Sequence, residues 1–197
     1  AEALASGIRS GEGQDRVTNT GTIAPEATAG ATAVSVGLTV TNAEKGLAAS
    51  AALADADSSA KAAARGIETG AGDDVIRNAG SVSPKAKAGT TAVGVDLGVG
   101  VTEQGVSLGA SLAESNASSA AAAVGIDSGK GNDRVSNTGQ IALDSQSDAT
   151  AVSVGLSVTY AKQGVGASVA VVDARSAADA TARGIEAGEG NDAIANE

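Results

Sequence analysis

A short motif rich in glycine and aspartate holds the residues of this chain whose types and spacing are most suggestive of chemistry. Its four copies read SGEGQDRVT (10–18), TGAGDDVIR (69–77), SGKGNDRVS (128–136) and AGEGNDAIA (187–195). Glycine supplies positive φ at a turn, and aspartate hydrogen-bonds its local backbone. The motif therefore predicts a turn. It does not predict a phosphate-binding loop, because no Gly-Lys-Ser/Thr follows it and its flanks read as strands.

Other catalytic chemistry has little basis in the sequence. The chain contains no His and no Cys, and no Ser lies in a G-x-S-x-G setting. Paired carboxylates could in principle hydrolyse glycosides, but an active site is a unique constellation, whereas these acidic motifs occur in every copy. We therefore expect a protein that is not an enzyme.

The motif resembles the nonapeptide G-G-x-G-x-D-x-U-x of the RTX-type repeat family, as found in giant bacterial extracellular repeat proteins of the adhesin or matrix type. Every copy matches at the second, fourth, sixth and eighth positions, and the first position carries Ser, Thr, Ser or Ala in place of Gly. The resemblance covers the turn and not the rest of the chain. It implies an extracellular β-solenoid in which the aliphatic residue at position eight points into the core.

The resemblance also implies calcium as a cofactor, held by turn carbonyls and the aspartate, since calcium takes about six to eight oxygen ligands. Carried over by position, the ligand residues are Asp15, Asp74, Asp133, Asp192, Gly11, Gly13, Gly70, Gly72, Gly129, Gly131, Gly188 and Gly190. RTX motifs run consecutively, whereas here the motif occurs once in 59 residues. If those residues form one large coil, the loops stack and can share calcium. If they form three coils of about 20 residues, the loops lie too far apart to share it.

Internal repetition determines the organisation of the chain. The motif segments begin at Gly7, Gly66, Gly125 and Gly184, each 59 residues after the last, without an insertion or deletion. Stacked units that share a core resist such length changes. We expect repeats at 7–65, 66–124 and 125–183, with 1–6 ending a preceding repeat and 184–197 beginning a truncated fourth. The chain is then a segment of a longer array.

Within each repeat the pattern indicates strands. Val34, Val36, Leu38 and Val40 alternate with Ser35, Gly37, Thr39 and Thr41, which is typical of a strand with one buried face. A polar turn ending on Gly46 follows, and then a second alternating stretch from Leu47 to Leu53. The two stretches form either a hairpin or successive sides of a coil. The fold class predicted is all-β: an elongated, parallel β-helix-like solenoid of 59-residue repeats.

Two further features have alternative interpretations. The alanine-rich segment 58–66 favours helix by propensity but is too short for a stable helix, so we expect a strand of small residues. Asn19, Asn78, Asn137 and Asn196 recur once in each copy. They form either a hydrogen-bonded ladder along stacked coils or left-handed turn residues.

Composition limits the partners. The net charge of −10 argues against nucleic acid and favours a divalent cation. No apolar run of about 18 residues exists, so we expect no membrane insertion. The expected function is that of a structural region outside the cell or at its surface: an adhesin stalk, a matrix protein or a filament that associates with itself or with further copies of its repeat. The alternative is a binding module that presents a regular Thr/Ser face (Thr32, Thr39, Thr41) to glycan, ice or mineral.

Overall fold

The computed structural model describes residues 1–197 and consists of strands and turns, without a helix. Parallel pairing joins equivalent strands of successive repeats into three sheets, so the predicted all-β, parallel β-solenoid is confirmed. The sheets are ordered β1-β4-β7-β10, β2-β5-β8-β11 and β3-β6-β9. The strands are β1 (Glu2–Arg9), β2 (Arg16–Asn19), β3 (Thr22–Ile23), β4 (Glu26–Glu68), β5 (Val75–Asn78), β6 (Ser81–Val82), β7 (Lys85–Asp127), β8 (Arg134–Asn137), β9 (Gln140–Ile141), β10 (Asp144–Glu186) and β11 (Ala193–Asn196).

Each 59-residue repeat forms one coil. Val36 pairs with Val95, and Val95 pairs with Val154, so equivalent residues of successive repeats are neighbours across a single strand spacing. The alternative of three coils in each repeat is wrong. The motif loops therefore stack directly on one another.

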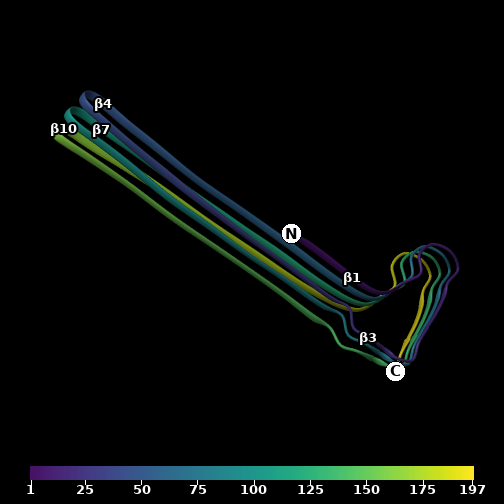
Figure 1. The fold of residues 1–197 in the computed structure, drawn as a ribbon. Coiled ribbons are helices and arrows are strands. Elements are labelled where there is room, and N and C mark those ends of the chain that lie inside the picture. The colour runs from purple at the N-terminus through teal and green to yellow at the C-terminus, as the bar shows by residue number, and fades with distance from the viewer.

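The long strands β4, β7 and β10 each run out from the base of the molecule and return to it (Figure 1). In β4 the outgoing arm covers residues 26–43, the bend lies at 44–46, and the returning arm covers 47–68. Gly46 has φ of 98° at the bend. The arms are opposite walls of one coil, because side chains of one arm bond the backbone of the other, as between Thr39 Oγ1 and the Ala51 carbonyl at 2.8 Å. The two alternating stretches are thus sides of a coil.

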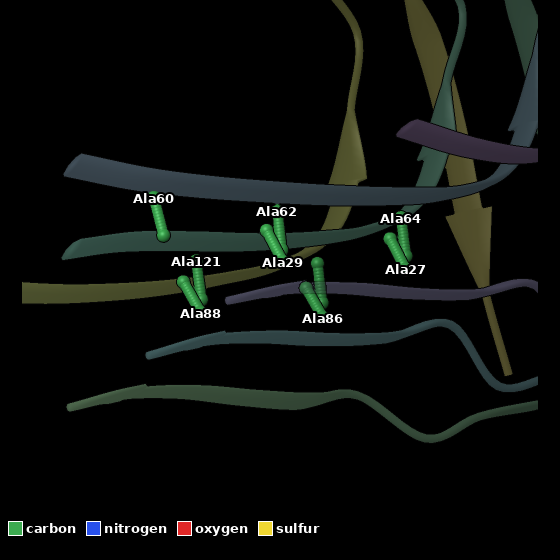
Figure 2. Packing of buried hydrophobic residues seen from close by; sticks show 9 residues of the cluster. Ala27, Ala29, Ala60, Ala62, Ala64, Ala86, Ala88 and Ala121 are labelled. Carbon is green, nitrogen blue, oxygen red and sulfur yellow. The ribbon is translucent and has the colours of Figure 1, made fainter. Parts of the chain in front are cut away.

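The space between the two walls is filled by very small side chains. Nine alanines form its largest buried cluster, and Figure 2 shows them pointing between the arms from both sides. Their small size lets the walls approach more closely than the spacing of about 10 Å typical of stacked sheets. The cluster consists of Ala27, Ala29, Ala60, Ala62, Ala64, Ala86, Ala88, Ala121 and Ala123. Segment 58–66 is strand, as expected.

The valines and leucines of the alternating stretches lie on the outside of these walls. Val36 is 72% exposed in the first coil, and Val95 is 37% exposed in the middle coil. The pattern correctly predicted strands with one buried face, but the buried face is the one that carries Ser35, Gly37 and Thr39. The reason is the narrow gap between the walls, which is filled mainly by Ala, Ser and Gly, while the inward threonines Thr39 and Thr41 donate to carbonyls of the opposite arm.

Large aliphatic side chains pack only at the base, where the coil widens around the short strands. There Val17, Ile76 and Val135, at position eight of the motif, are buried with Ile67 and Val82. The inward orientation implied for position eight is therefore observed in the first three copies, while Ile194 in the last copy is 48% exposed. No helix in the structure is long and apolar enough to cross a membrane.

Candidate functional site

The four motif loops form a stack at the base of the coils. All eight motif glycines named as ligand residues have positive φ, between 83° and 144°. Gly72 and Gly131 require glycine for two reasons: their φ is positive, and a Cβ would collide with the carbonyl of the equivalent glycine one coil earlier. The motif is thus both a turn and a stacking surface.

Backbone hydrogen bonds join each loop to the next. The Gly13 amide donates to the Ala71 carbonyl at 2.7 Å, and the Gly72 amide donates to the Lys130 carbonyl at 2.7 Å. In the opposite direction, the Lys130 amide donates to the Gly70 carbonyl at 2.8 Å. Several of the loop carbonyls are therefore already acceptors.

The motif aspartates form a second ladder. The backbone amide of each donates to Oδ1 of the aspartate in the next coil, at 2.7 Å from Asp15 to Asp74, 2.9 Å from Asp74 to Asp133, and 2.9 Å from Asp133 to Asp192. Asp74 and Asp133 are almost fully buried. The structure thus brings all four predicted aspartates together in one column.

The other oxygen of each buried carboxylate has no partner. The Oδ2 atoms of Asp15, Asp74 and Asp133 are buried and accept no hydrogen bond. Neighbouring carboxylates stand one strand spacing apart, about 4.8 Å, so like charges repel along the column. No group of three or more acidic side chains converges on one point. Each gap supplies two side-chain oxygens, so a cage of about six oxygens for calcium would also need the second lone pairs of loop carbonyls, and water.

The asparagine column is a hydrogen-bonded ladder. Nδ2 of each asparagine donates to Oδ1 of the next, at 2.7 Å from Asn19 to Asn78 and 2.6 Å from Asn78 to Asn137. The ladder continues to Asn196 at 2.6 Å. The alternative of left-handed turn residues is wrong, because only glycines have positive φ.

A row of carboxylates lies just before the motif and was not singled out from the sequence. Glu68, Asp127 and Glu186 are neighbours in register. Glu68 pairs with Arg65 at 3.1 Å, whereas the position equivalent to Arg65 in the middle repeat is Val124. Burial raises the pKa of Asp127, and the charge of Glu186 raises it further, while Arg65 lowers it. This position carries Arg65, Val124 and Arg183 in the three repeats. The missing arginine in the middle repeat is the sequence feature that could have pointed to an uncompensated carboxylate at Asp127.

The proposed Thr/Ser face does not exist as one surface. Thr32 is exposed on the outer wall, whereas the hydroxyls of Thr39 and Thr41 point across the coil and donate to carbonyls of the returning arm. Residues at odd and even positions of a strand lie on opposite faces.

The base of the coils thus combines three columns that hold successive coils in register: glycine loops, aspartates and asparagines. Each column repeats the same contact at every coil. Comparison with known protein families, curated proteins and solved structures finds no match for this chain.

Proposed function

We propose that this chain is a structural repeat region that acts outside the cell or at its surface, as the body of a filament or matrix assembled by stacking coils. The observation that carries the proposal is the unbroken register of 59 residues from coil to coil, from Glu26 pairing with Lys85 through to Glu186 pairing with Asp127. The backbone and side-chain contacts of the base repeat with it, so further coils of the same sequence fit on the same pattern.

The coil geometry favours a filament or matrix body over a spacer stalk. Each coil uses 59 residues but adds only one strand spacing along the stacking axis, about 4.8 Å. Each arm has about 18 residues and so extends about 60 Å across that axis. A chain built in this way makes a broad ribbon that extends only a short distance along the stacking axis for the number of residues used.

Catalysis has no part in the proposal. The acidic columns present the same group at every coil, and no position in them combines a nucleophile, a base and an oxyanion donor. The residues that do vary between coils, such as Asp57, Asn116 and Arg175, lie side by side on the outer wall, where Asn116 Nδ2 donates to Asp57 Oδ1 at 2.9 Å.

Edge-to-edge assembly is the route that we propose for self-association. Within residues 1–197 the outer edge of β10 pairs with no strand and β4 is covered by β1 only from Lys61 to Glu68, so a coil of a neighbouring repeat or of another copy fits on either edge. Unpaired strand edges present rows of amide and carbonyl groups to another copy. Negative-stain electron microscopy of the concentrated chain should show ribbons about 60 Å wide that lengthen along the stacking axis. Separate particles at every concentration would contradict assembly through the edges.

We also propose calcium as a stabilising ligand of the aspartate column. The buried Oδ2 atoms without partners support this, because stacked negative charges need a compensating charge. A ligand that binds only the folded state stabilises it by about 2.7 kcal/mol at a hundredfold excess over its Kd. We expect millimolar calcium to raise the melting temperature, and EGTA to reverse the rise.

Asp74→Asn combined with Asp133→Asn is the matched control for calcium. Asn keeps an Oδ1 acceptor for the amide of the preceding coil but removes the charge, so this variant should melt at the same temperature with calcium and with EGTA. Superposed melting curves for the unmodified chain would remove calcium from the account and leave the motif as a stacking turn.

A further inference from the structure

The outer surface of the outgoing arms carries an apolar panel. Four outward positions on each arm are valine or leucine in all three coils, and in-register pairing aligns them into four straight rows. The rows are Val34, Val93 and Val152; Val36, Val95 and Val154; Leu38, Leu97 and Leu156; and Val40, Val99 and Val158.

Stacking of coils does not bury this panel. Val95 has a neighbouring coil on each side and is still 37% exposed, so adding coils to the array leaves the panel open to solvent. The panel is also free of charge. Its flanking rows carry Thr32, Thr91 and Thr150 toward the base, and Asn42, Val101 and Tyr160 toward the bend. The net charge of −10 is carried elsewhere.

The area of the panel grows with the number of coils. The rows from Val34 to Val40 extend about 23 Å along the arm and each coil adds about 4.8 Å, which gives roughly 110 Å² for each coil. Three coils present about 330 Å², which equals the largest apolar patch of a typical monomer, and a longer array exceeds it and reaches the size that marks interaction sites. A standard interface uses about 800 Å² on each partner, which corresponds to about seven coils.

We propose that the apolar panels of two copies of this chain pack face to face, so that stacked ribbons pair laterally. This rests on the proposed structural function and adds a second contact to the edge contact. The panel is uncharged, and its rows are in register and evenly spaced from coil to coil, so the same surface on a second copy can pack on it about a two-fold axis. Because each coil contributes area, pairing is weak for three coils and strong for a long ribbon.

Sedimentation velocity of the 197-residue chain, up to about 1 mM, tests the proposal through three sets of isosteric exchanges. Replacing one row of the panel (Val36→Thr, Val95→Thr, Val154→Thr) should weaken the dimer at least about tenfold. Adding a row (Thr32→Val, Thr91→Val, Thr150→Val) should strengthen it. The same exchange on the opposite wall (Val165→Thr, Val169→Thr, Val171→Thr) should leave it unchanged. Raised salt should strengthen the dimer of the unmodified chain, because it screens the net negative charge.

All exchanged side chains lie on the outer walls and keep their β-branched shape, so far-UV circular dichroism should report the same fold for every variant. A spin label at Val95→Cys, unique because the chain has no cysteine, gives a second readout that replaces only one of the twelve valine and leucine side chains of the panel. In the dimer its intermolecular separation should be short, on the order of 10–20 Å.

Several results would overturn the pairing. An unmodified chain that stays monomeric over the whole range would do so, as would equal effects of exchanges on the two walls. Association that persists in all variants would place self-association at the strand edges alone, leaving the proposed function intact. Binding of the monomer to phosphatidylcholine vesicles, lost in the Val36, Val95 and Val154 variant, would assign the panel to lipid and refute the pairing.

Discussion

Alanine substitutions at two glycines of the motif separate the cost of a strained turn from the cost of blocked stacking. Gly13 and Gly72 occupy the same motif position, with φ of 122° and 139°. A Cβ at Gly13 meets nothing within 4 Å, whereas a Cβ at Gly72 collides with the carbonyl of Gly13. The two variants therefore share the dihedral strain and differ only in the contact with the preceding coil.

The expected magnitudes follow from these contacts. Holding alanine at positive φ costs about 1–2 kcal/mol, which is the whole cost of Gly13→Ala. In Gly72→Ala the two loops must also move apart, which weakens the bond from the Gly13 amide to the Ala71 carbonyl and its neighbours, at about 0.5–1.5 kcal/mol each. We expect Gly72→Ala to cost about 3–5 kcal/mol in total.

Urea unfolding followed by far-UV circular dichroism measures the difference. An extra loss of about 2 kcal/mol corresponds to a further fall of roughly 4–8 °C in melting temperature for a chain of this size. If the two alanine variants unfold at the same urea concentration, the loops do not stack coil on coil, and the register described for the base is refuted.

Three further substitutions test individual polar side chains: Asn78 of the asparagine column, Asp96 on the inner face of β7, and Asp127 of the carboxylate row before the motif. Asn78→Ala removes two buried ladder bonds and should cost about 2–4 kcal/mol in urea unfolding; a loss below about 1 kcal/mol would mean that the ladder does not form. Asp96→Asn keeps an acceptor for the Ser111 hydroxyl and the Leu112 amide but removes a buried charge whose Oδ1 has no partner, so it should raise stability by about 1–2 kcal/mol, and a decrease would contradict this. Asp127→Asn should stabilise the fold at pH 7, because the raised pKa of Asp127 means that its ionisation destabilises the folded state. That benefit should vanish below about pH 3.8, the ordinary pKa of an aspartate carboxyl, because the group is then protonated in both the folded and the unfolded state; equal stabilisation at pH 3 and pH 7 would refute the electrostatic cause.

The sequence predicted the features that depend on the 59-residue period and on the positions of the motif glycines. The exact period predicted repeats that stack without a change of length but left open one coil or three in each repeat, and the register from Val36 to Val95 to Val154 shows that there is one. The motif glycines were expected at positive φ because no other residue tolerates it well, and the structure agrees.

The buried face of the long strands could not be predicted from the alternation of apolar and polar residues alone, because it depends on the distance between the two walls of a coil. A two-residue period shows that a strand has two different faces but not which face is buried. The assumption that valine and leucine go inside fails here, since the walls of one coil meet mainly across alanine and serine. A signal was present in the returning arms, where the inward positions, such as Ala48, Ser107 and Gly166, are Ala, Ser or Gly in every repeat except at Val172, while the outward ones vary more widely.

The candidate site was predicted in composition and only partly in geometry. The aspartates were identified by type, and their stacking followed once each repeat was a single coil. Their hydrogen bonds to amides of the preceding coil could not be foreseen, because a turn sequence does not show whether its carboxylate faces its own backbone or that of a neighbour. The raised pKa of Asp127 likewise arises from burial and from neighbours one coil away.

The distance between equivalent residues two repeats apart tests the central claim, one coil in each 59-residue repeat, most directly. Thr32 and Thr150 are exposed on the outer wall, and Thr32→Cys with Thr150→Cys gives two unique positions for spin labels in a chain without cysteine. With one coil in each repeat, their backbones lie two strand spacings apart, about 10 Å, and the labels should broaden each other's spectra strongly. Three coils in each repeat would place them about 29 Å apart, and a dipolar distance near that value would contradict the account.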